Sequence, residues 1–131
     1  QLECRERIQA HRRSAWDVYA SALGQWAATN NVALPTIPGH CEQPYHLFYL
    51  LLPDLDSRTR FIAHMRSRGV FTVIHYLPLH LSDMGQRFGG RPGEFPVTER
   101  VSDQLVRLPL HNLLTGHEQE EVIDAILDFK V

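Results

Sequence analysis

Apolar side chains recur at helical spacing along the first 29 residues. The positions are Ile8, Ala15, Tyr19, Ala22, Leu23 and Trp26. Side chains three or four residues apart lie on one face of a helix, so these positions form a single apolar stripe. Residues 3–29 contain no proline, and Gly24 is their only glycine. The pattern predicts one long amphipathic helix whose stripe packs on another surface.

Three short apolar runs follow, and each lies next to a proline or glycine or contains one. Residues 30–44 hold three prolines and a glycine, so we expect a loop there. Residues 45–52 are aromatic and apolar and stop at a proline, which predicts a central strand. Residues 70–74 form a largely β-branched run after a glycine, which predicts a buried strand. Residues 106–110 predict a third strand, and Pro109 places it toward a sheet edge.

Helical patterns separate and follow these strands. We expect Asp56 to cap a helix over residues 57–68, which a glycine terminates. Pro96 is expected to open a short helix, because apolar residues recur every four positions after it. Thr115 and Glu118 have the spacing of a capping box, and an apolar helical face follows them. The sequence therefore predicts a last helix that begins near residue 116.

The predicted order is helix, strand, helix, strand, helix, strand, helix, or α-β-α-β-α-β-α. Alternation of this kind favours an α/β fold, with a small mixed or antiparallel three-stranded sheet and helices packed on it. With 131 residues the chain is long enough for one domain with a core. We expect residues 1–29 to form a long linking helix and residues 45–131 to form the α/β sandwich.

Composition and charge narrow the class of protein. The net charge is −2 with neutral histidines, and the sequence does not predict a basic surface for nucleic acid. No apolar run approaches membrane-spanning length, so no membrane partner is expected. The two cysteines, Cys4 and Cys41, are too few for a disulfide framework. We therefore expect free thiols and a cytoplasmic location.

The chain begins without methionine inside a predicted helix and contains a single lysine, Lys130, next to its end. Both features lead us to expect a piece of a longer protein. A lysine that forms a Schiff base needs a pocket that desolvates and orients its amine, and a chain terminus does not supply one. Lysine chemistry of that kind is therefore not expected in this chain.

Candidate chemistry gathers where the predicted second strand ends. His75, Tyr76 and His80 lie around Pro78, which has no N–H for a sheet ladder. One interpretation is structural, with a packed tyrosine and histidines bonded to loop backbone. Another is a polar rim that binds a hydroxyl-rich ligand such as a sugar, because imidazole and phenol both donate and accept. A zinc site of His75, His80 and His111 is a third, weaker reading, because no HExxH or CxxC motif is present.

A glycine-rich stretch follows at residues 84–93. A phosphate cradle requires a strand directly before it and a helix directly after it, and neither is predicted here. A flexible loop is therefore expected. Ser82 and Asp83 follow His80, but no nucleophile-elbow motif surrounds the serine.

Five segments, in order along the chain, together resemble the DegT/StrS-type nucleotide-sugar aminotransferases. They are His75-Tyr76-Leu77-Pro78-Leu79-His80, Met84-Gly85-Gln86-Arg87-Phe88-Gly89-Gly90, Pro96-Val97-Thr98-Glu99, Leu108-Pro109-Leu110 and Leu114-Thr115-Gly116-His117-Glu118. Any one segment is weak evidence, whereas the ordered set is fairly specific. The stretch from His80 to Gly90 is most similar to family members that aminate the 4-keto carbon of a dTDP-4-keto-6-deoxy sugar.

The resemblance implies that the chain is the C-terminal small domain of a fold-type I enzyme that uses pyridoxal phosphate. Family enzymes carry the Schiff-base lysine and bind the cofactor mainly through a large N-terminal domain, which this chain lacks. The implied reaction transfers an amino group from glutamate to a dTDP-sugar, and a homodimer is implied. The chain alone is then expected to bind no cofactor, to hold no catalytic residue and to be inactive.

The resemblance also implies roles for residues of this chain. His75, Tyr76 and His80 are expected to contact the sugar nucleotide and to orient its 4-keto carbon. Arg87 and Arg91 are candidates for the diphosphate, although a solvated face is the plainer interpretation of both. The Gly85–Gly93 loop is a candidate lid. The alternative from another class of protein is a non-enzymatic interaction module that binds a partner through the exposed stripe of the first helix.

Overall fold

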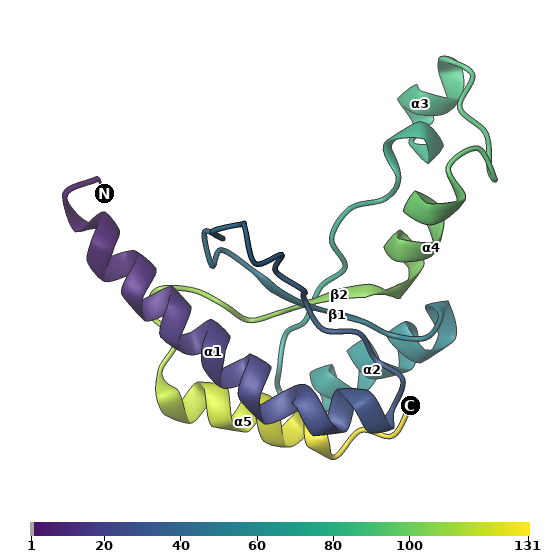
Figure 1. The fold of residues 1–131 in the computed structure, drawn as a ribbon. Helices are drawn as coiled ribbons and strands as arrows, with labels where there is room; N and C mark the ends of the chain where they lie inside the picture. Colours follow the sequence, from purple (N-terminus) through teal and green to yellow (C-terminus); the bar gives the residue numbers. More distant parts are fainter. Residues whose placement is uncertain (1) are drawn as a thin grey trace.

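The computed structural model describes residues 2–131 (Figure 1). The helices are α1 (Arg5–Thr29), α2 (Leu55–Ser67), α3 (Asp83–Arg87), α4 (Pro96–Gln104) and α5 (Gly116–Leu127), and the strands are β1 (Phe48–Leu51) and β2 (Leu105–Leu108). Short 3-10 turns lie at Leu2–Cys4 and Leu79–Leu81. The α/β class is confirmed, and every predicted helix is present. Within residues 2–131, no helix combines the length and the apolar character needed to span a bilayer.

The sheet is antiparallel and smaller than expected. β1 pairs with β2 from Phe48 opposite Leu108 to Leu51 opposite Leu105. The expected strand at 70–74 is reduced to one bridge, in which Val73 and Arg107 exchange backbone hydrogen bonds of 3.4 and 2.8 Å. In this register the next pair would need an N–H from Pro109, which proline lacks. Pro109 thus ends the ladder, and the prediction of a full strand at 70–74 was wrong.

The bridge also corrects the position of β2. The expected edge strand has β1 on one side and the Val73 segment on the other, so it lies inside the sheet. The segment around Val73 is covered on one face only, and the other face is open. Val70 and Thr72 are buried, whereas Phe71 is 70% exposed, because alternate side chains of an extended chain point to opposite faces.

The core lies on one face of the sheet, beneath α1, α2 and α5 (Figure 1). The ring of Trp16 on α1 packs edge-on against Phe48 of β1, with centroids 5.2 Å apart. Phe61 of α2 packs edge-on against Phe129, which follows α5, also at 5.2 Å. Trp26 Nε1 donates to the Phe129 carbonyl at 3.1 Å, so the end of α1 is joined to the chain after α5.

The apolar stripe of α1 is therefore covered by the same chain, contrary to the exposed stripe assumed for an interaction module. Its buried members are Ala15, Trp16, Tyr19, Leu23, Trp26 and Ala27. Ala22, which the spacing also placed on the stripe, is exposed. Ile8 is only half-buried, so the covered part of the helix is its C-terminal half.

The predicted cap of α5 is confirmed, whereas the predicted cap of α2 is not. The capping box of α5 is confirmed, with Glu118 N donating to Thr115 Oγ1 at 3.2 Å and Thr115 N donating to Glu118 Oε2 at 2.8 Å. The cap of α2 is Asp54 rather than Asp56. Asp54 has extended backbone angles and accepts from Ser57 N at 2.7 Å, so the helix begins two residues earlier than expected.

Residues 75–104 form an arm that leaves the sheet and carries α3 and α4 (Figure 1). The glycine-rich stretch at 84–93 was expected to be a flexible loop, but its first part is helix α3. Ser82 caps that helix by accepting from Gly85 N at 3.1 Å. The arm therefore has a regular internal structure, and all five predicted site residues lie on it.

Candidate functional site

The arm places the predicted site residues in two groups. His75 and Tyr76 lie in the extended segment that leaves the sheet, with ring centroids 4.5 Å apart and planes at 64°. Both are exposed, Tyr76 by 73%. His80 lies further along, in the 3-10 turn before α3, where its side chain is only 11% exposed. The two groups thus offer one accessible aromatic pair and one fixed, recessed imidazole.

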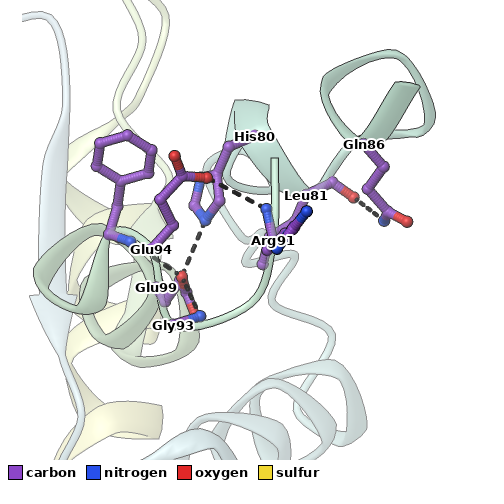
Figure 2. Close-up of polar contacts among 8 residues, drawn as sticks. His80, Leu81, Gln86, Arg91, Gly93, Glu94 and Glu99 are labelled. Carbon is purple, nitrogen blue, oxygen red and sulfur yellow. Dashed lines mark hydrogen bonds and ion pairs between the residues drawn. The ribbon is translucent and has the colours of Figure 1, made fainter. Parts of the chain in front are cut away.

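His80 is fixed by Glu99 of α4. Its Nε2 lies 2.9 Å from Glu99 Oε1 (Figure 2). Glu99 also accepts from Gly93 N at 2.9 Å to each carboxylate oxygen and from Phe95 N at 3.3 Å. A carboxylate that receives several donors is held in its charged form, and it can only accept. His80 Nε2 therefore donates to Glu99, and Nδ1 is the ring nitrogen that this contact does not engage.

The same hydrogen bonds control the ionisation of Glu99. The backbone N–H of Gly93 is the main cause that lowers the pKa of Glu99 below its ordinary value of 4.5, and the hydrogen bond from His80 adds to it. Glu99 is thus ionised at neutral pH. It stands in the first turn of α4, where the N–H groups at the start of a helix favour negative charge. One carboxylate therefore ties the turn of His80, the loop at Gly93 and the start of α4 together.

Two glycines let the chain fold closely around the His80 turn. A Cβ at Gly85 would collide with the carbonyl oxygen of Leu79, and a Cβ at Gly90 would collide with the carbonyl oxygen of His80. Gly90 N donates to Gly85 O at 3.0 Å, which closes α3 behind the turn. The glycines serve this close approach, and the structure gives a reason for the glycine-rich motif that spacing alone did not provide.

Phe95 completes the surroundings of His80. Its ring packs edge-on against the imidazole, with centroids 4.8 Å apart. The ring lies just before α4, at its N-cap position, so the loop and the start of the helix form one wall beside His80. An aromatic side chain packed on one flank and a carboxylate at one nitrogen leave the imidazole few ways to move.

The two candidate arginines do not converge on His80. Arg87 is exposed at the end of α3. Arg91 is exposed in the loop before α4, and its backbone N donates to Glu94 Oε2 at 3.2 Å. A shallow hollow of about 470 Å³ is lined by Gly89, Arg91, Pro92, Gly93 and Glu94. The Glu94 carboxylate in the same hollow works against a phosphate at that place.

The zinc reading does not fit the geometry. Across residues 2–131 the structure brings together no group of three or more histidine, cysteine, aspartate or glutamate side chains that could hold a metal ion. His80 is occupied by Glu99. His111 instead accepts from Leu113 N at 3.3 Å through Nδ1, in the turn before α5. A centre of His75, His80 and His111 is therefore excluded for the described residues.

Sequence reasoning did not single out Glu99 as a functional residue. A usable signal was present, because Pro96 marks the start of a helix and an acidic residue in the first turn of a helix is favoured by the free N–H groups there. A glutamate at that place reaches back to the backbone before the helix, as Glu99 does to Phe95. The sequence spacing of these residues does not show that the His80 side chain also binds the Glu99 carboxylate.

Comparison with known proteins identifies the fold. The profile of the DegT/DnrJ/EryC1/StrS aminotransferase family matches residues 1–127. DesV from Streptomyces venezuelae superposes with a TM-score of 0.87 at 26% identity, over 97% of this chain and 33% of that one. The aminotransferase TlmJ from Streptoalloteichus hindustanus gives 0.84 at 26% identity, over 97% and 33%.

Curated relatives agree with the structural neighbours. Uncharacterized protein MJ1066 of Methanocaldococcus jannaschii is 32% identical over 97 residues, or 70% of this chain and 25% of that protein. The dTDP-3-amino-3,4,6-trideoxy-alpha-D-glucose transaminase of Streptomyces venezuelae is 29% identical over 119 residues, or 90% and 30%. The chain thus spans only a quarter to a third of these relatives.

The fold is that of an aminotransferase segment, in which helices cover one face of a small antiparallel sheet. The chain belongs to the DegT/DnrJ/EryC1/StrS aminotransferase family.

Proposed function

We propose that this chain is the C-terminal small domain of a pyridoxal-phosphate-dependent nucleotide-sugar aminotransferase. The observation that carries the proposal is the family match over residues 1–127, combined with a site that holds His80 rigidly on a projecting arm. In the proposed enzyme, α1 links the domain to a large N-terminal domain, and the molecule works as a homodimer in the cytoplasm.

The chain's own residues do not fit the cofactor. Pyridoxal phosphate is held in such enzymes by a lysine whose amine is desolvated in a pocket. Lys130 is the only lysine of the chain, and it is exposed beyond the end of α5. No step of the chemistry is therefore assigned to this chain, and we expect it to be inactive without the large domain.

The role proposed for the arm is to position the sugar nucleotide. With Nε2 donating to Glu99, Nδ1 of a neutral His80 ring is an acceptor, which suits a hydroxyl or amine donor of the substrate. His75 and Tyr76 add exposed polar groups on aromatic rings, which can pack on the apolar face of a sugar. Arg87 and Arg91 remain candidates for the diphosphate, on the basis of their charge alone.

For the substrate we propose a dTDP-4-keto-6-deoxy sugar, aminated at C4 with glutamate as donor to give dTDP-4-amino-4,6-dideoxygalactose. The similarity of the stretch from His80 to Gly90 to that class supports this choice. The second candidate is amination at C3. It is favoured by the names of relatives, which include 3-amino-sugar transaminases from Streptomyces venezuelae and Aneurinibacillus thermoaerophilus.

The test is a product assay with the full-length enzyme, glutamate, pyridoxal phosphate, and dTDP-sugars that carry the ketone at C3 or C4. We expect turnover of the 4-keto sugar, with nitrogen on C4 by NMR of the product. Nitrogen on C3 would establish the second candidate. No turnover of either sugar with several amino donors would contradict a sugar aminotransferase altogether.

A further inference from the structure

The face of the sheet opposite the helices carries an arginine whose Nε has no hydrogen-bond partner within the described chain. Arg107 is the third residue of β2, between Val106 and Leu108, which are buried in the core. Alternation along the strand directs Arg107 to the outer face. Its Nε is buried, and no residue of the described chain forms a hydrogen bond with it. Arg107 as a whole is half-buried, and its one buried nitrogen without an acceptor marks a place where a ligand could accept a hydrogen bond.

A small cavity lies beside Arg107 on this face. It measures about 220 Å³ and is lined by His46, Leu47, Phe71, Val73, Arg107, Leu108, Pro109 and Leu110. Pairing of Val73 with Arg107 places these two residues on the same face. Because the pairing is antiparallel, Phe71, two residues before Val73, and Pro109, two residues after Arg107, come next on that face. The sheet register thus builds one apolar wall around the guanidinium.

The charges in the cavity select for an anion. Arg107 carries a permanent positive charge, and His46 adds a ring that can donate a hydrogen bond. No aspartate or glutamate belongs to the lining, so within the described chain nothing there neutralises the arginine. The remaining walls are apolar side chains and backbone, which suit a short hydrocarbon tail.

We infer that this cavity binds a small carboxylic acid, with the Arg107 guanidinium pairing its carboxylate. A planar guanidinium matches a carboxylate with two parallel hydrogen bonds. One permanent positive charge balances one carboxylate, whereas a phosphate dianion would leave excess charge in a mainly apolar site. The site lies on the sheet, apart from the His80 arm, and it does not depend on the proposed transaminase activity.

The test is NMR titration of the 15N-labelled chain with sodium propionate, followed at the Arg107 Nε–Hε resonance and the amides of Val73 and Leu110. Sodium chloride at matched ionic strength and sodium phosphate serve as reference titrations. We expect a saturating downfield shift of the Arg107 resonance with propionate only. Shifts that do not saturate, or that chloride reproduces, overturn the inference, and tighter binding of phosphate overturns the assignment to a carboxylate.

Substitutions distinguish a specific contribution of Arg107 from a general effect of positive charge on anion binding. Arg107→Gln is expected to weaken propionate binding roughly tenfold or more, because hydrogen bonds to a charged group are lost. Arg66→Gln, which removes an exposed charge on α2, is the matched control and is expected to bind as the parent does. If Arg107→Gln does not fold, Arg107→Lys, which keeps the charge without the planar fork, is expected to bind more weakly. Unchanged binding by the folded Arg107 variant overturns the site.

Discussion

His80 and Glu99, nineteen residues apart, join the two ends of the arm through a 2.9 Å hydrogen bond between Nε2 and Oε1. The contact connects the turn before α3 to the first turn of α4 (Figure 2). It also fixes the proton on Nε2 of the imidazole, because the carboxylate can only accept. The arrangement of the proposed sugar-binding surface therefore depends on this pair.

Glu99→Gln tests the pair through the pH dependence of stability. The folded-state pKa of Glu99 lies below its ordinary value of 4.5, so the ionised carboxylate stabilises the fold at neutral pH. That contribution is lost as the pH falls through the lowered folded pKa. We expect Glu99→Gln to lower the thermal midpoint at pH 7, and the deficit to shrink below about pH 4, by calorimetry at both values. An equal deficit at both values would show that the charge of Glu99 is not involved.

Gly90→Ala tests whether the glycine-rich stretch is shaped by close approach. The new Cβ would meet the His80 carbonyl, so the turn must open. We expect a loss of about 1–3 kcal/mol in the free energy of unfolding from denaturant titration, as for other overpacked sites. Gly24→Ala is the matched control, because it adds the same methyl group inside α1 with no heavy atom within 4 Å. It is expected to stabilise by about 0.5–1 kcal/mol. Equal effects of the two variants would contradict the explanation.

A pair of aspartate substitutions tests the description of the sheet. Val106 is fully buried in β2, and Val73 is half-buried in its single bridge on the outer face. Val106→Asp is expected to unfold the chain, because an unpaired charge in the core costs several kcal/mol. Val73→Asp is expected to leave it folded with a smaller loss. The measurement is the denaturant midpoint by circular dichroism, and unfolding by Val73→Asp would restore the buried strand that the sequence suggested.

Local signals predicted the four longer helices, although they misplaced the cap of α2 and missed α3. The long stripe from Ala15 to Trp26 and the capping box of Thr115 need only neighbours within a turn or two. The strand at 70–74 was overestimated because sheet pairing depends on the partner, and its partner contains Pro109. An apolar run cannot show that alternate side chains such as Phe71 will lie outside the core.

The sequence predicted only part of the candidate site, because contacts between distant segments are not visible in local sequence. A histidine cluster before a glycine-rich stretch is visible in the sequence, and the structure places those residues on one arm. The Glu99 contact arises from the approach of two segments, which spacing does not encode. The same holds for Gly90, whose need for a small side chain comes from the His80 carbonyl beside it.

His80→Ala in the full-length enzyme tests the proposed role of the arm most directly, because the two halves of a transamination can be measured separately. In the proposed enzyme, amino transfer from glutamate to the cofactor would proceed without the sugar, and transfer to the sugar nucleotide would be the second half. If the arm positions the sugar, single-turnover spectroscopy will show an unchanged first half and a second half with kcat/KM lowered about 10- to 100-fold, at an unchanged thermal midpoint. Equal slowing of both halves, or collapse of the thermal midpoint, would contradict a sugar-facing role for His80.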